Sequence, residues 1–210
     1  MLAAPYITTA LVYVGAIATA VYLWLDNTPS LWTYLSASAP AGQVEYVLSK
    51  LCGLLGVSLL LSQFIIGLSN RLAPKAPAFP HSTRLHAQIG LLTVVIVVLH
   101  VLLFILAAKS RGDAHFYLLL LPLWSDDSYR QGLSLGALAV WLLPAVTVGG
   151  VLRYFRPPTT TIRYLHRLVG ITIFLTILHA LRVGSEITLV VFLFLVGLWV
   201  LAWLLRPLVR

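Results

Sequence analysis

Four histidines are the side chains of this sequence best suited to chemistry. They lie in two apolar stretches, with His86 and His100 in one and His166 and His179 in the other. A neutral imidazole is a common ligand of transition metals, and it also exchanges protons near neutral pH. Which chemistry applies depends on where the two stretches place the four rings.

The spacing of these histidines places them at two matching heights. If both stretches are helices, the two histidines of the first stretch lie about 21 Å apart along the axis, and those of the second lie about 20 Å apart. Helices that run in the same direction then set His86 level with His166, which we call the first pair. They also set His100 level with His179, which we call the second pair.

The angular spacing is less regular than the heights. In an ideal helix, fourteen residues bring His100 to within about 40° of the face that holds His86. Thirteen residues leave His179 about 140° away from the face of His166. If both of the latter are to face the first stretch, their helix must be locally irregular, for instance through a π-bulge, which is common at functional sites.

Two imidazoles from facing helices are what bis-axial ligation of a b-type heme requires. The sequence has no Cys-x-x-Cys-His motif for covalent attachment. We therefore infer two heme b groups, with the four histidines as axial ligands of the heme iron. The two pairs are too far apart to share a single zinc ion.

Neighbouring residues fit this interpretation. Gly90 and Gly170 each lie four residues after the first histidine of their stretch, where a missing side chain leaves room for a flat macrocycle. Arg163 and Arg182 each lie three residues from a histidine and are candidates to pair with heme propionates. Arg163 also has a simpler interpretation as a cytoplasmic anchor of its helix.

The composition shows which elements must position these residues. Hydrophobic residues make up 60% of the 210 residues and charged residues 10%, with a mean hydropathy of +0.97, whereas a soluble domain carries about 25% charged residues. A soluble enzyme is excluded. Six apolar runs have about the length that a helix needs to cross a bilayer. They predict an all-α, six-helix membrane bundle that forms a single domain over residues 1–210. The predicted spans are 6–25, 47–69, 85–107, 132–153, 162–183 and 187–205.

The net charge of +8 is distributed unevenly between the connecting segments. With a cytoplasmic N-terminus, the inner segments hold nine basic residues and no acid, and the outer segments hold every acid and five basic residues. This asymmetry predicts that both termini are cytoplasmic, and it explains the charge without a nucleic-acid partner. The inner basic residues are Arg71, Lys75, Arg84, Arg153, Arg156, Arg163, Arg167, Arg206 and Arg210.

The remaining reactive side chains contribute less. Cys52 is the only cysteine, so the chain itself can form neither a disulfide nor a cysteine-ligated cluster, and we expect a core thiol. His81 and His115 fall in predicted loops, and we expect both to be surface residues. His115 belongs to an outer loop, on the side where an electron acceptor would bind.

The pattern His86-x13-His100 with His166-x12-His179 resembles that of the ferric-reductase-like transmembrane domain superfamily. This superfamily includes NADPH oxidases, ferric reductases and the heme subunit of the methionine-sulfoxide reductase system. The resemblance covers six spans with ligands on the third and fifth, and it includes the unequal spacing. It implies a conduit in the cell membrane that passes electrons from a cytoplasmic flavin through an inner and an outer heme to an outer acceptor.

One feature departs from the oxidases and ferric reductases. Their chains continue into domains that bind FAD and NAD(P)H, whereas this sequence ends at Arg210. We therefore expect the FAD to belong to a separate flavin reductase or to a missing domain. The outer acceptor is oxygen, ferric iron or a periplasmic redox protein, and the sequence does not decide among them.

Two other functions stay open at the sequence level. A cytochrome b that exchanges electrons with quinone also uses paired histidines on two helices, although no quinone-site motif is visible. A transporter or assembly protein without heme would use the histidines for proton transfer or packing. A purified protein without colour would favour the latter.

Overall fold

The computed structural model describes residues 4–28, 30–36, 38–72, 83–155 and 159–184, and these residues form helices and connecting loops without any strand. The fold of the described chain is therefore all-α, as predicted. In order, the helices are α1 (Ala4–Asp26), α2 (Leu31–Tyr34), α3 (Gln43–Leu72), α4 (Thr83–Ser110), the 3-10 helix η1 (Phe116–Leu120), α5 (Ser128–Phe155), α6 (Thr160–Arg167) and α7 (Val169–Val183).

Five helical segments of the described chain are long and apolar enough to cross a membrane. They are Thr9–Asp26, Gln43–Gly67, Leu85–Ser110, Ser128–Phe155 and Thr160–Val183, the last formed by α6 and α7 together. The chain is thus a multi-pass membrane protein, and these five agree with the predicted spans to within a few residues. The sixth predicted span, 187–205, lies outside the described residues.

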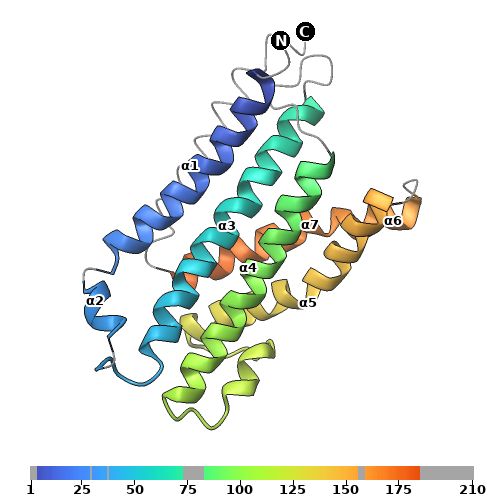
Figure 1. Cartoon of the computed structure of the whole chain (residues 1–210). Coiled ribbons are helices and arrows are strands. Elements are labelled where there is room, and N and C mark those ends of the chain that lie inside the picture. The colour runs from blue at the N-terminus through green and yellow to red at the C-terminus, as the bar shows by residue number, and fades with distance from the viewer. Residues whose placement is uncertain (1–3, 29, 37, 73–82, 156–158, 185–210) are drawn as a thin grey trace.

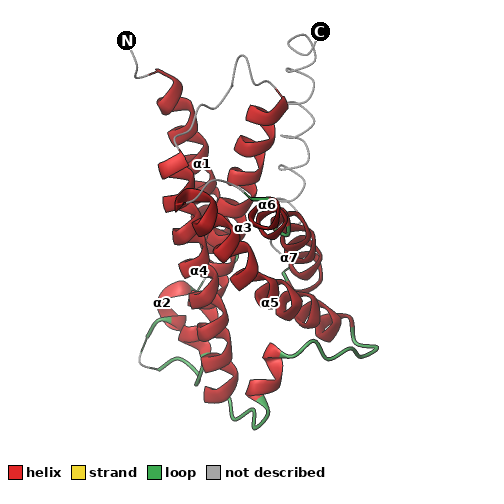
Figure 2. Cartoon of the chain, turned by 90° about the vertical axis from the view of Figure 1, so that its right-hand side faces the viewer, coloured by secondary structure: helices red, strands yellow, loops and turns green. Residues whose placement is uncertain are grey.

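The helices form two groups that are inclined to each other. Helices α1, α3 and α4 run nearly along one direction, each antiparallel to the next, whereas α5 and α7 are tilted relative to them (Figure 1, Figure 2). Within the groups, α3 packs on both α1 and α4, and α5 packs on α6 and α7. The histidine-bearing helices α4 and α6–α7 therefore belong to different groups and face each other across the space between them.

A continuous core joins α1, α3 and α7. Ala20 of α1 is fully buried, and small residues of this kind let helices approach closely in a membrane. Around it pack Leu23 and Trp24 of α1, Leu54 of α3 and Ile173 of α7. The indole Nε1 of Trp24 donates a hydrogen bond of 2.9 Å to the carbonyl of Val47, which ties the C-terminal end of α1 to the N-terminal end of α3.

The irregularity that the thirteen-residue spacing predicts lies at Leu168, between α6 and α7. Leu168 has φ −59° and ψ −17°, which is close to 3-10 geometry. Its backbone N–H donates to both Leu165 (3.2 Å) and Tyr164 (3.3 Å). The winding is therefore tightened at this point, whereas a π-bulge would widen it. Because α6 and α7 are separate helices, the angle calculated for one ideal helix does not apply.

Helix α5 approaches α6 closely at one of its glycines. Helix α5 runs continuously through Pro144. A Cβ atom on Gly149 would lie 2.7 Å from the backbone nitrogen of His166, which is too short for any side chain. Only glycine at this position lets α6 lie against α5 at this distance.

We predict that Trp24→Phe lowers the free energy of unfolding by about 1 kcal/mol, because the Val47 carbonyl loses its indole partner. Denaturation in detergent measures this effect. Trp32→Phe is the matched control, since Trp32 is 83% exposed. An equal loss in both variants would contradict the assignment of the bond as stabilising.

Candidate functional site

The structure brings the four histidines together in the two pairs that their heights predict. The ring centres of His86 and His166 lie 6.1 Å apart, with their planes at 85°. Those of His100 and His179 lie 6.4 Å apart, with their planes at 66°. In both pairs one ring comes from α4 and the other from the α6–α7 segment, so each pair bridges the two helix groups.

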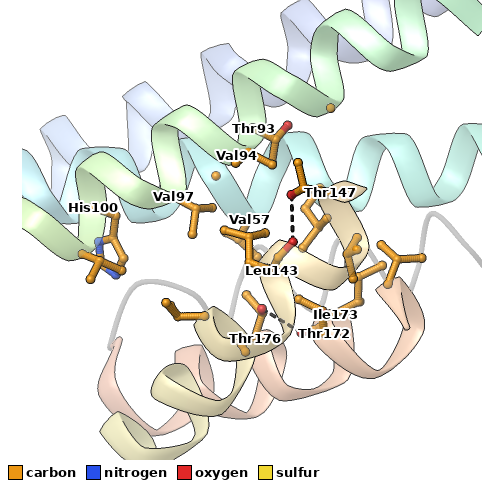
Figure 3. A pocket seen from close by; sticks show the side chains of 18 of the residues that line it. Val57, Thr93, Val94, Val97, His100, Leu143, Thr147, Thr172, Ile173 and Thr176 are labelled. Carbon is orange, nitrogen blue, oxygen red and sulfur yellow. Dashed lines mark hydrogen bonds between the residues drawn. The ribbon is translucent and has the colours of Figure 1, made fainter. Parts of the chain in front are cut away.

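Both pairs line one continuous cavity of about 1240 Å³ between the two groups of helices. Pockets for single small molecules usually measure about 300–1000 Å³. Figure 3 shows part of this cavity, with His100 and Val97 on the α4 wall and Thr147, Thr172 and Thr176 on the wall formed by α5 and α7. The cavity therefore has room for more than one ordinary ligand, and it reaches both histidine pairs.

The two rings of the second pair are oriented by backbone carbonyls. The Nδ1 atom of His100 lies 2.8 Å from the carbonyl oxygen of Ser49, and the Nδ1 atom of His179 lies 2.8 Å from the carbonyl oxygen of Gly132. A carbonyl only accepts, so Nδ1 must carry the proton in each bond. In a neutral ring the other nitrogen, Nε2, then keeps its lone pair and is ready to bind a metal.

The same local sequence feature exposes both of these carbonyls. A helical carbonyl points toward the residue four positions later, whose side chain normally covers it. That residue is Gly53 for Ser49 and Gly136 for Gly132. A Cβ on Gly53 would lie 3.1 Å from His100 Nδ1, and one on Gly136 would lie 2.7 Å from His179 Nδ1. The glycines therefore leave the space that each ring occupies.

The first pair is held differently. A Cβ on Gly150 of α5 would lie 3.7 Å from Nδ1 of His166, which is ordinary contact. Nδ1 of His166 is buried and has no hydrogen-bond partner among the described residues. The two pairs thus share their spacing but differ in how the α6–α7 histidine is oriented.

The other predicted site residues are only partly brought to the cavity. Gly90 and Arg163 line it. Gly170 is exposed, and a Cβ there would meet nothing within 4 Å, so the structure gives it no place beside the cavity. Arg182 is also exposed, and its Nη1 donates to Gln131 Oε1. His115 lies in an exposed loop, whereas His81 lies outside the described residues.

Several residues that line the cavity were not predicted from the sequence. Arg153 and Arg167 line it together with Arg163. Arg163 and Arg167 are close to His166 in the sequence, and the charge of Arg153 acts on the His166 ring, so all three lie near the first pair. The two carbonyl contacts were also missed. Their sequence signal is a small residue four positions before a glycine, as in Gly132-x3-Gly136, a spacing that favours close helix packing in membranes.

The arrangement is suited to holding one metal between the rings of each pair. A metal–imidazole bond is about 2 Å long, so two rings that ligate one metal from opposite sides have centres about 6 Å apart. No cluster of three or more His, Cys, Asp and Glu side chains occurs in the described part of the chain. Each pair therefore supplies two ligands, which suits a metal whose remaining ligands come from a planar macrocycle.

Comparison of the chain with family models, with curated proteins and with solved structures finds no match.

We predict that Gly136→Ala lowers the free energy of unfolding by about 1–3 kcal/mol, because the added methyl group overlaps the His179 ring. Thermal unfolding in detergent measures the loss. Gly170→Ala is the matched control, because that position is open and alanine favours a helix. The assignment fails if both variants unfold at the wild-type temperature.

Proposed function

We propose that this protein is a transmembrane electron conduit that holds two heme b groups, one between the rings of each histidine pair. The iron of each group, when bound, supplies one-electron chemistry by changing between its ferric and ferrous states. The protein residues ligate, orient and insulate the two groups and make or break no bonds in a substrate.

The observation that carries this proposal is the geometry of the second pair. Two rings from different helix groups have their centres 6.4 Å apart, and each donates Nδ1–H to a backbone carbonyl. Such bonds fix the tautomer and raise the basicity of a ligating imidazole. A histidine that served only to join two helices would have no need to keep Nε2 without a hydrogen-bond partner.

The cavity wall between the pairs suits an apolar macrocycle. Thr147, Thr172 and Thr176 reach the cavity, but each hydroxyl donates to a carbonyl four residues earlier on its own helix, at 2.7, 3.1 and 2.8 Å. Two of these bonds are drawn in Figure 3. Because their protons are engaged, these hydroxyls attract water less strongly than free ones would. The wall thus insulates the electron path.

Three arginines at one end of the cavity support an orientation for the conduit. Arg153, Arg163 and Arg167 line its end near the first pair and can form charge-assisted hydrogen bonds with propionates there. Lys and Arg are concentrated on the cytoplasmic side of membrane proteins. We therefore propose that the first pair is the inner one, that the N- and C-termini are cytoplasmic, and that a sixth span completes the bundle.

This orientation assigns the redox partners to opposite sides. Electrons would enter from a flavin-containing reductase on the cytoplasmic side and leave to an acceptor at the outer face of the cell membrane. The resemblance of the histidine spacing to the ferric-reductase-like superfamily supports the same direction of transfer.

The deciding experiment is an absorption spectrum of the purified protein, oxidised and dithionite-reduced, with heme counted by the pyridine hemochrome assay. We expect about two heme b groups for each chain and the low-spin bands of bis-histidine ligation. No heme, after expression with sufficient heme supply, would overturn the proposal.

Single variants assign the two groups to their pairs. His100→Ala or His179→Ala is expected to remove the heme of the second pair and leave that of the first. His115→Ala is the matched control and retains both, since its ring lies in an exposed loop. Full heme content in both pair variants would contradict the assigned ligands.

Labelling with a membrane-impermeant maleimide in a Cys52→Ala background tests the proposed orientation. Asp126→Cys is expected to react in intact cells, because it lies beside the acidic outer end of α5. Thr160→Cys, at the arginine-rich end, reacts only after permeabilisation. Both positions are exposed in the structure. The reverse labelling pattern would contradict the proposed orientation.

A further inference from the structure

A pair of buried polar side chains lies halfway between the two histidine pairs. Thr93 of α4 is seven residues after His86 and seven before His100, so it lies about 10 Å from each along the helix. Gln63 of α3 contacts it. Both side chains line the cavity, although Gln63 is only 8% exposed and Thr93 only 5%. A polar side chain at this depth in a membrane indicates a functional role.

The hydrogen bonds fix which way the Gln63 amide points. The hydroxyl of Thr93 donates to the carbonyl of Ile89 at 2.8 Å. Its oxygen is therefore free to accept, and it accepts from Nε2 of Gln63 at 3.1 Å. With Nε2 placed toward Thr93, the amide oxygen Oε1 must point the other way.

The amide oxygen points toward the first pair. A Cβ on Gly90 would lie 3.5 Å from Oε1 of Gln63, and Gly90 itself lines the cavity one helical turn from His86. The threonines on the opposite wall turn their hydroxyl protons to their own helices. Gln63 thus presents a partial negative charge to the part of the cavity beside the first pair.

We propose that Gln63, held by Thr93, lowers the reduction potential of the heme at the first pair. This inference rests on the proposed function. A partial negative charge in a medium of low dielectric constant stabilises the oxidised, more positive state of a nearby centre. The potential of that heme falls, because its reduction removes the stabilised charge. Gln63 is therefore a tuning residue that does not touch the iron.

The asymmetry between the two pairs gives this tuning a purpose. The carbonyl bonds of His100 and His179 make these ligands more electron-rich, which lowers the potential at the second pair. A lower potential at the first pair then favours transfer from the first pair to the second. The amide oxygen of Gln63 lowers the potential at the first pair, which is the change that this direction of transfer needs.

Redox titration of the purified, heme-loaded full chain tests this inference. In Gln63→Met, which keeps the length of the side chain but lacks the amide, we expect a higher midpoint potential at the first pair and little change at the second. The equilibrium constant for electron sharing between the hemes should change by about fivefold, the size of one polar interaction. The same titration in a His179→Ala background reports the first heme alone.

Two further variants sharpen the test. Thr93→Val keeps the shape of the side chain but releases the amide, and it should shift the same potential in the same direction by a smaller amount. This variant carries the test if Gln63→Met does not retain heme. Ser62→Ala is the matched control, because Ser62 is equally buried on α3 but bonds to its own helix and does not line the cavity. It should leave both potentials unchanged.

The outcomes separate this inference from the proposed function. A wild-type chain that binds no heme overturns both. A chain with two hemes, in which neither Gln63→Met nor Thr93→Val moves the first potential, overturns the inference alone. A shift of equal size in Ser62→Ala would also overturn it, because the effect would then come from general changes in packing.

Discussion

The contact between a histidine ring and an uncovered helix carbonyl is the interaction that sets the geometry of the second pair. A ring nitrogen can reach a carbonyl inside an intact helix only where the residue one turn later has no side chain. Gly53 and Gly136 meet this condition at equivalent places on α3 and α5. The rings then cross between neighbouring helices within each group and extend into the cavity, so helix packing and the orientation of these two rings follow from the same two glycines.

The membrane makes such contacts necessary as well as possible. In hydrocarbon every polar group needs a partner inside the protein, and the described part of the chain meets this demand mostly within single helices. The cavity threonines bond to their own backbones, and Trp24 bonds across to α3. Gln63 differs because its bond to Thr93 leaves the amide oxygen facing the cavity. In an apolar environment the partial charge of this oxygen acts on neighbouring groups more strongly than it would in water.

The division into two helix groups explains why a large cavity survives in a membrane bundle. Helices α3 and α4 pack closely with each other, and α5 packs closely with α6 and α7, whereas the contacts between the groups are fewer. Helices α5 and α7 are tilted relative to α4 (Figure 2), and the cavity occupies the gap between the two groups. The histidine pairs bridge this gap, so a ligand held by both rings of a pair would also join the two halves of the described chain.

The sequence by itself determined the five spans that the structure describes, the positions of the four histidines and the matching of their heights, because hydropathy and the rise of a helix act along one axis. It also required an irregular helix between His166 and His179, since thirteen residues do not return to one face. Only the tertiary structure decided where that irregularity lies, at Leu168, and that it tightens the winding. It also decided that Gly53 and Gly136, rather than Gly170, make room beside the histidines, and that Arg182 bonds to Gln131. These features depend on which helices are neighbours and how they are rotated, and a periodic pattern in a single chain contains neither quantity.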